Sequence, residues 1–232
     1  METIRIASID IGKINFAFLI EEINIEKINL ENIQKNKRYN IDGTVTNNFK
    51  KILDSVCING ITILYKNSNI TTGCIKGKYI EQKLFHNMNT LLDEYSSYFD
   101  TCSIIIIEKQ MSFGKKINTM ALKLGQNCMS YFIFKYGMFK TIIEFPAYYK
   151  TQILGCSKII KTNKKGVSKY ISVDKSKRKK WSIEEAINIL TLRNDIITLE
   201  YLKTSKKKDD LADVLTQLQA FKYLFFIEKI IF

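Results

Sequence analysis

Four acidic residues of this sequence stand where a charge is costly to bury, and such carboxylates can do metal-dependent chemistry if the fold brings them together. Asp10 ends a mostly apolar segment near the start of the chain, and Glu108 directly follows four consecutive isoleucines. Asp210 and Asp213 are three residues apart, so on a helix they share one face. Magnesium prefers hard oxygen ligands, and the cation offsets repulsion between clustered acids. Together the four side chains could hold two magnesium ions ~4 Å apart, which activate water and stabilise the leaving oxygen in phosphoryl transfer.

Each of these acids also has an ordinary structural explanation. Asp10 stands just before a turn that it can cap, and Glu108 can be solvated where a strand leaves the core. Acidic residues in the first turn of a helix complement its dipole, which accounts for Asp210 and Asp213 without any ligand. Asp209, four residues before Asp213, would share the same face, so the spacing alone does not select the pair.

The element expected to position Asp10 is a strand. Residues 4–15 (IRIASIDIGKIN) alternate so that Ile6, Ser8 and Asp10 share one face, and residues 16–20 predict the hairpin partner of this strand.

Glu108 is expected at the end of a central strand. Residues 102–110 (CSIIIIEKQ) are apolar and β-branched on both faces, which is typical of a strand covered by helices on both sides. Strand ends of such sheets are where α/β proteins place their sites. Hydrophobic periodicity predicts further elements: strands at 61–65 and 141–145, and helices at 81–99, 118–137, 181–192 and 209–226.

Several segments carry an additional interpretation. Residues 24–59 are polar and read as a partly helical insertion between strands, and residues 194–208 read as a shorter connection. Ser182 and Glu185 have the spacing of a capping box that would begin the helix at 181. Gly125 inside a predicted helix costs roughly 1 kcal/mol, which indicates close approach by another helix or by a partner subunit.

Length and charge limit the class of protein. The chain has 232 residues, of which 46% are hydrophobic, and we expect a single globular domain spanning 1–232. The net charge of +13 favours a polyanionic partner. Because the lysines lie mostly in polar runs, we expect nucleic acid and no membrane, and the longest apolar runs are too short to cross a bilayer.

Cysteine usage indicates a reducing compartment. The five cysteines are odd in number and scattered, with no C-x-x-C pair, and the chain has a single histidine, His86. We therefore expect free thiols and no zinc site, with His86 on a helix surface or cap. No secretory signal is recognisable at the start, so we expect a soluble intracellular protein. Heavy use of Lys, Asn and Ile is typical of an AT-rich genome.

Positive charge is concentrated late in the chain. Residues 158–180 contain ten Lys and Arg and one Asp. Such a run can be a solvated face, but it follows a candidate site, and we interpret it as part of a basic loop, residues 155–180, that tracks phosphates. These contacts carry little sequence information, so we expect weak sequence specificity. The residues expected to contact DNA, two of them in a shorter loop, are Lys115, Lys116, Lys164, Lys165, Lys177, Arg178, Lys179 and Lys180.

The order of these elements and acids resembles the RNase H-like nucleases, and specifically the RuvC-type Holliday junction resolvases. The resemblance is carried by five segments in family order: SIDIGKINFA (8–17), IIIEKQ (105–110), ALKLGQN (121–127), EFPAYYKT (144–151) and KKDDLADVL (207–215). EFPAYYKT is most similar to the resolvases of poxviruses and related large DNA viruses. The resemblance implies an α/β, RNase H-like fold with a mixed central sheet of about five strands, helices on both faces and an N-terminal insertion.

Carried over residue by residue, the resemblance implies that Asp10, Glu108, Asp210 and Asp213 are the catalytic carboxylates and hold two magnesium ions, for which manganese can substitute. The resemblance favours Asp210 over Asp209, because the two helical acids of the family are three residues apart, as Asp210 and Asp213 are.

The resemblance also implies a homodimer that binds a four-way DNA junction and nicks two strands symmetrically, leaving 5′-phosphate and 3′-hydroxyl ends. Lys150 matches a family lysine near the scissile phosphate. The helix that carries LKLGQN is the expected dimer face, which would explain Gly125. A viral member would act in the host-cell cytoplasm at sites of DNA replication, or be packaged in the virion.

Three other functions fit part of the sequence. A ribonuclease that cleaves RNA–DNA hybrids would use the same acids. A non-catalytic junction-binding protein would fit the charge, but it would not need all four carboxylates. Sugar kinases and actin-like ATPases also open with a D-x-G strand and turn, yet they need a second phosphate loop and a longer chain. ATP binding in the absence of DNA would favour this last function.

Overall fold

The computed structural model describes residues 3–28, 31–75, 81–110, 117–162 and 166–232. Within them, the strands form a five-stranded sheet in the order β3-β2-β1-β4-β5 and a separate two-stranded hairpin, β6-β7. β1 pairs antiparallel with β2 and parallel with β4, so the sheet is mixed, as expected. The strands are β1 (Thr3–Asp10), β2 (Phe16–Asn24), β3 (Ile61–Ser68), β4 (Ile104–Lys109), β5 (Thr141–Pro146), β6 (Lys158–Thr162) and β7 (Ser168–Ser172).

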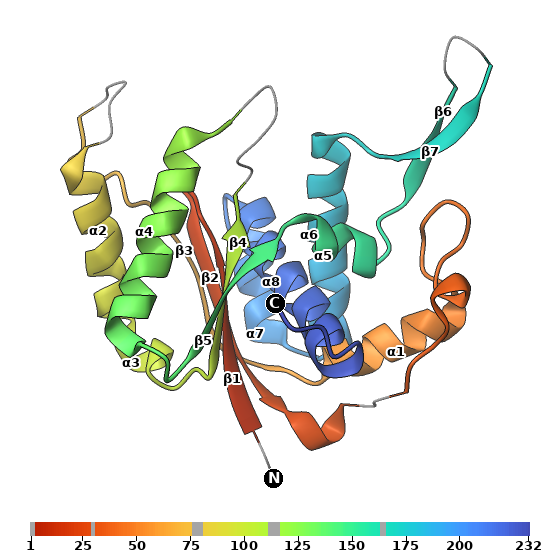
Figure 1. The fold of residues 1–232 in the computed structure, drawn as a ribbon, viewed down its shortest axis with the longest axis horizontal. Helices are drawn as coiled ribbons and strands as arrows, with labels where there is room; N and C mark the ends of the chain where they lie inside the picture. The colour runs from red at the N-terminus through yellow and green to blue at the C-terminus, as the bar shows by residue number, and fades with distance from the viewer. Residues whose placement is uncertain (1–2, 29–30, 76–80, 111–116, 163–165) are drawn as a thin grey trace.

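Helices cover both faces of the sheet. α2 and α4 pack on one face, while α8, backed by α6 and α1, packs on the other (Figure 1). The helices are α1 (Asn47–Ile58), α2 (Gln82–Glu94), α3 (Ser96–Phe99), α4 (Thr119–Tyr136), α5 (Tyr148–Ile153), α6 (Lys175–Leu192), α7 (Ile196–Thr204) and α8 (Lys208–Lys222), with 3-10 turns η1 (Ile25–Lys27) and η2 (Lys35–Lys37) and a π-helical turn η3 (Tyr223–Ile227).

The alternation of β1 is as predicted. Ala7 and Ile9 are buried beneath α2 and α4, while Ile6 and Ser8 face α8. The Ser8 hydroxyl donates a 2.8 Å hydrogen bond to the Val214 carbonyl of α8. β4 behaves in the same way, since alternate isoleucines enter the two cores. Because side chains alternate along a strand, every second residue of β1 and of β4 faces α8.

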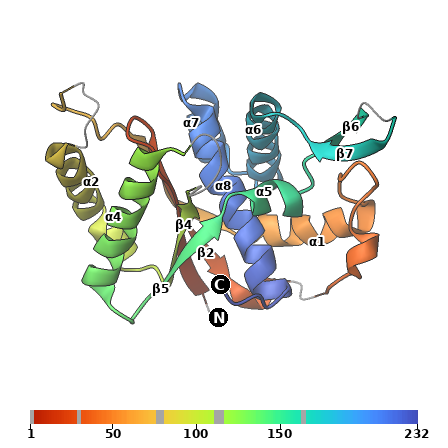
Figure 2. The ribbon, with the colours of Figure 1, turned by 45° about the horizontal axis from the view of Figure 1, so that its top comes forward.

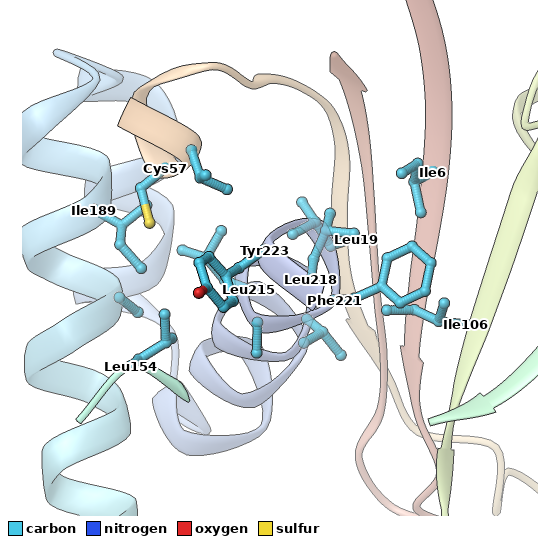
Figure 3. Packing of buried hydrophobic residues seen from close by; sticks show 14 of the residues in the cluster. Ile6, Leu19, Cys57, Ile106, Leu154, Ile189, Leu215, Leu218, Phe221 and Tyr223 are labelled. Carbon is cyan, nitrogen blue, oxygen red and sulfur yellow. The ribbon is translucent and has the colours of Figure 1, made fainter. Parts of the chain in front are cut away.

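α8 is buried on almost all sides between the sheet and α6. Figure 3 shows Leu215, Leu218 and Phe221 of α8 between Ile6 on the sheet and Ile189 on α6. A helix in this position must satisfy its own polar side chains. Accordingly, Gln217, which is buried, donates hydrogen bonds to β1 at the Ser8 hydroxyl (3.1 Å) and the Ile9 carbonyl (3.3 Å). Hydrogen bonds thus fix α8 on the sheet at the carboxyl end of β1.

Two expectations about the basic region were wrong. The predicted capping box at Ser182 does not begin a helix, because α6 begins at Lys175 with the Asp174 side chain accepting from the Lys177 amide. Residues 155–180 are not a plain loop either, since they form the β6-β7 hairpin and the first turns of α6.

The other connections also differ in detail. Residues 194–208, expected as a plain connection, contain α7. The 24–59 insertion contains α1 and two 3-10 turns, which confirms its partly helical character. Gly125 is buried, and a Cβ added to it would lie 3.6 Å from Gln110 Cγ, so the neighbour that approaches this glycine is a side chain of its own chain. All five cysteines are free thiols. None of the described helices combines the length and apolarity needed to cross a membrane.

Candidate active site

The two strand-end acids lie next to each other. β1 and β4 are parallel neighbours with Ile9 paired to Ile107, so Asp10 and Glu108 leave the sheet at the same edge and on the face that α8 covers. Each carboxyl group shifts the pKa of the other, which places the two groups within interaction distance. The structure therefore brings together the two strand ends that the sequence predicted would converge.

Lys150 joins the strand end to the late helix. It lies on α5, which follows directly after β5, and its side chain is buried. Lys150 Nζ is 2.9 Å from Glu108 Oε1 and 2.9 Å from Asp213 Oδ2. Figure 2 shows α5 following the end of β5 and lying beside α8. One ammonium group thus bridges acids from two elements that are far apart in the sequence.

Asp213 is held at both carboxylate oxygens. Oδ2 meets Lys150, and Oδ1 accepts a 2.8 Å hydrogen bond from the hydroxyl of Ser182 on α6. Ser182 is buried and also lies 3.2 Å from the hydroxyl of Thr216 on α8. Both partners fix the orientation of the carboxylate before any ligand binds.

Asp210 and Asp209, which sequence spacing did not separate, have different surroundings. Asp209 forms an ion pair with Lys179 of α6. Asp210 Oδ2 is buried and accepts no hydrogen bond from the described residues. Burial, followed by the nearby charges of Asp209 and Asp213, raises the pKa of Asp210 to about 6. Among the described residues, Asp210 thus has an unsatisfied oxygen and lies near Asp213, whereas Asp209 has a partner.

The electrostatics of the cluster reflect crowded acids around one cation. Burial, and then the neighbouring charge of Glu108, raises the pKa of Asp10 well above its ordinary value. Burial would also raise the pKa of Glu108, but the Lys150 ammonium and its hydrogen bonds lower that pKa below its usual range. The pKa of Lys150 is raised by Glu108 and Asp213 in spite of its burial. The two neighbouring carboxyl groups are therefore shifted in opposite directions, Asp10 upward and Glu108 downward.

We call Asp10, Glu108, Asp210 and Asp213 with Lys150 the acid cluster. Its donor chemistry suits magnesium, because all of its acids offer hard oxygen ligands and one of these oxygens is buried without a partner among the described residues. In the described part of the chain, no group of three or more His, Cys, Asp or Glu side chains is already arranged around a metal position. The Lys150 ammonium supplies the positive charge between Glu108 and Asp213.

The expected DNA-contact residues are only partly described. Lys115, Lys116, Lys164 and Lys165 lie outside the described residues. Lys177, Arg178 and Lys180 are exposed on the first turns of α6. Lys179, by contrast, is paired with Asp209, so its charge is already satisfied within the chain.

Sequence reasoning missed two side chains that hold the acids. Ser182 was interpreted as a helix cap because S-x-x-E is a common start pattern, and its contact with Asp213 spans 31 residues. Gln110 Nε2 is 3.4 Å from Glu108 Oε2 and 3.3 Å from the Glu108 carbonyl. Gln110 is two residues beyond Glu108 on an extended chain, so this spacing was the available signal.

Two viral proteins are similar to this chain in sequence. Uncharacterized protein 170L of Invertebrate iridescent virus 6 is 37% identical over 240 residues, covering 98% of this chain and 92% of that protein. Uncharacterized protein 97L of Invertebrate iridescent virus 3 is 28% identical over 231 residues, covering 94% of this chain and 98% of that protein. No protein-family model matches the chain.

Solved structures identify the fold. RuvC of Thermus thermophilus aligns with a TM-score of 0.50 and 10% identity over 95% of each chain. The yeast mitochondrial Holliday junction resolvase Ydc2 aligns with a TM-score of 0.46 and 13% identity, over 97% of this chain and 86% of that one. The likeness to RuvC, together with the mixed five-stranded sheet, confirms the expected RNase H-like fold.

Proposed function

This chain belongs to the same family as protein 170L of Invertebrate iridescent virus 6, and we propose that it is a structure-selective DNA endonuclease that resolves four-way (Holliday) junctions. The observation that carries the proposal is the convergence of Asp10 and Glu108 with Asp213 of α8 around Lys150. These are the motif residues through which the sequence resembles the RuvC-type resolvases, and the RuvC fold supports the same assignment.

The acid cluster would act by binding magnesium. Asp10, Glu108, Asp210 and Asp213 would hold the cations, and manganese would substitute. When bound, the ions activate water and stabilise the leaving oxygen of a phosphodiester. Ser182 holds Asp213 in orientation. Lys150 keeps Glu108 and Asp213 together in the absence of a cation. It would also supply a positive charge beside the scissile phosphate.

The basic surface supports DNA as the substrate. The chain carries a net charge of +13, and Lys177, Arg178 and Lys180 are exposed on the helix that also supplies Ser182 to the acid cluster. A polyanion is therefore attracted towards the side of the molecule that holds the acids. In a virus, this activity would process recombination, repair and replication intermediates.

We also propose that the protein acts as a homodimer, as symmetric nicking of a junction requires. The carboxyl end of α4 and the turn after it leave Phe134, Met138 and Phe139 almost fully exposed. Large apolar side chains grouped on a surface are typical of association sites. Sedimentation of the wild type should give a dimer, and Phe134→Ser with Phe139→Ser should give a monomer that nicks only one strand.

The decisive experiment compares wild-type protein with Glu108→Gln on a synthetic four-way junction, a linear duplex and an RNA–DNA hybrid. We expect magnesium-dependent cleavage of the junction by the wild type and none by the variant. Glu144→Gln is the matched control, because Glu144 lies on the neighbouring strand β5 but hydrogen-bonds Gln126 on α4 instead of the acid cluster. Preferred cleavage of the hybrid would show a ribonuclease, and junction binding without any cleavage would show a non-catalytic protein.

A further inference from the structure

The β6-β7 hairpin is inserted between the two elements that hold the acid cluster from outside the sheet. α5, which precedes the hairpin, carries Lys150, and α6, which follows it, carries Ser182. Figure 1 shows the hairpin projecting from the body of the protein beyond the amino end of α6. Whatever the hairpin contacts is therefore bound next to the acid cluster.

No other layer of the protein, in the part of the chain that the structure describes, covers this hairpin. All five residues of β6 are exposed, as are four of the five residues of β7. Ile160, which is 61% exposed, pairs with Tyr170, which is also exposed. An isolated two-stranded hairpin is marginally stable in water, and antiparallel ribbons normally bury one face. A ribbon that buries neither face lacks the usual source of stability within its own chain.

The charge of the ribbon is also unbalanced. Lys161 on β6 is directly opposite Lys169 on β7, and like charges in that position destabilise a strand pair. Both lysines are exposed, and they share a face with the pair Ile159 and Ile171. A partner with closely spaced negative charges would remove this repulsion.

The base of the hairpin, in contrast, is firmly placed. The Lys158 amide donates a 2.6 Å hydrogen bond to the Asp42 carbonyl in the 24–59 insertion. Gly155 has φ +80°, and a Cβ there would lie 2.6 Å from Val45 Cγ1, so the chain passes too close to that insertion for a side chain. The ribbon therefore leaves the body in a fixed direction, which makes it a presented surface and gives the insertion a supporting role.

We propose that the β6-β7 hairpin is an arm that lies in the major groove of one double-helical branch of the substrate, with Lys161 and Lys169 on backbone phosphates. The major groove, about 12 Å wide, admits a two-stranded β-ribbon. DNA supplies the row of negative charges that the lysine pair lacks, and the groove covers the face of the ribbon that turns towards the bases. The inference rests on the proposed function in one respect, namely that the substrate is double-helical DNA.

The test is a salt titration of DNA affinity for the wild type and for the double variant Lys161→Ala, Lys169→Ala. Binding is measured by fluorescence anisotropy without divalent cations, so that nothing is cut. Loss of two phosphate contacts lowers the slope of log affinity against log salt by about 1.8, so the advantage of the wild type should shrink about tenfold between 50 and 200 mM salt. Equal slopes for the two proteins would overturn the proposal.

A matched control distinguishes an effect of the arm from an effect of net charge alone. Lys27→Ala with Lys229→Ala removes the same charge, and Lys27 follows the end of β2 that is farthest from Asp10 in the strand pairing. This control should keep the wild-type slope. If it loses the same slope, the attraction is not specific to the arm, and the proposal fails.

A second variant removes the ribbon while leaving its base. Because Lys158 and Ser172 are directly paired, residues 159–171 can be replaced by Asn-Gly to close a shorter hairpin. We expect a loss of salt dependence at least as large as for the double lysine variant, because Lys164 and Lys165 are removed as well. The loss should be seen on both a four-way junction and a linear duplex, because the arm contacts ordinary double helix. Wild-type protein with no preference for the junction would count against the proposed function but not against the arm. Loss of binding to anionic vesicles, with DNA binding intact, would assign the arm to membranes instead.

Discussion

Two groups of buried charges lie under α8, near its opposite ends, and they are built differently. The acid cluster is near the amino end. Near the carboxyl end, Glu21 of β2 meets the guanidinium of Arg193 at 2.6 Å and the ammonium of Lys222 at 3.3 Å, and it accepts a 2.9 Å hydrogen bond from Gln219. We call Glu21, Arg193 and Lys222 the Glu21 cluster.

The difference lies in charge balance and access. In the Glu21 cluster, one carboxylate faces two cations and all three side chains are sealed from solvent. In the acid cluster, carboxylates outnumber the lysine, an Asp210 oxygen has no partner among the described residues, and several groups remain partly exposed. The first is complete without a ligand, and the second has an excess of negative charge that a cation would relieve. Stability should therefore depend mainly on the Glu21 cluster, and activity on the acid cluster.

The largest expected effect is on stability, from Glu21→Gln. The variant leaves Arg193 and Lys222 buried without a full counter-charge, which should cost about 3–5 kcal/mol of the free energy of unfolding. Urea denaturation measures it. Glu22→Gln is the matched control, because Glu22 pairs with Arg5 in a partly exposed position and should cost less than about 1 kcal/mol. Equal losses for the two variants would remove the distinction between a sealed and a surface pair.

The same cluster gives an acid-pH dependence. Burial would raise the pKa of Glu21, but Arg193 and Lys222 lower it below the ordinary value of 4.5. A carboxyl whose pKa is lower in the folded state contributes stability above its unfolded pKa and loses it as the pH falls through the folded pKa. Wild-type protein should therefore lose stability more steeply below pH 4.5 than Glu21→Gln. Parallel curves would show that Glu21 does not control acid unfolding.

The next effect is on cleavage, from Asp10→Asn. Removing one group that stabilises charge in the transition state, such as an oxyanion-hole donor, typically costs about 10²–10³ in rate, and we expect a loss of that size in junction cleavage. The free energy of unfolding without divalent cations should not fall, since burial and the neighbouring Glu108 raise the pKa of Asp10 and thus disfavour its charge, which the amide does not carry. Asp54→Asn, at a surface pair with Lys50, is the control and should retain full activity.

Lys150→Met tests how strongly the acid cluster responds to magnesium. Without the ammonium between Glu108 and Asp213, magnesium no longer competes with a lysine for these acids. We expect magnesium to stabilise the variant by about 1–2 kcal/mol more than the wild type, measured as the shift in melting temperature on adding MgCl₂ over EDTA. Lys222→Met should lose stability with no added response to magnesium. A smaller magnesium shift in Lys150→Met than in wild type would contradict this role.

The smallest effect is expected from Ser182→Ala, which removes one hydrogen bond to Asp213 Oδ1. Stability should fall by about 1 kcal/mol, and cleavage should fall a few-fold because the carboxylate loses its orientation. Ser182→Thr should restore part of the rate. Ser55→Ala, which removes a hydroxyl bond to the Ile52 carbonyl within α1, should leave the cleavage rate unchanged.

Local patterns were sufficient to predict the part of the site that the sheet provides. The alternation of β1 placed Ser8 and Asp10 on one face, and four isoleucines identified β4 as a central strand that ends near Glu108. Both follow from period two and from burial, which are visible in short windows. The helical face of Asp210 and Asp213 was visible in the same way, but the distinction from Asp209 required the ion pair with Lys179.

Long-range partners were not predictable. The hairpin partner was predicted only for residues 16–20, yet β2 continues to Asn24 and Glu21 is buried against Arg193, 172 residues later. No local pattern around Glu21 in the sequence predicts Arg193 as its partner. The helix start at Asp174 was missed because a run of lysines is typical of loops, although lysine itself is a good helix former.

α8 touches both charge groups, since Asp213 near its start belongs to one and Lys222 at its end belongs to the other. The two are about 13 Å apart along a helix whose intervening residues are buried. A displacement of α8 at one end is transmitted to its other end, because the packing around the helix leaves it little freedom to bend. A change that loosens the interior near Glu21 should therefore also disturb the position of Asp213, so that part of a stability loss at one end of α8 would reach the proposed activity at the other.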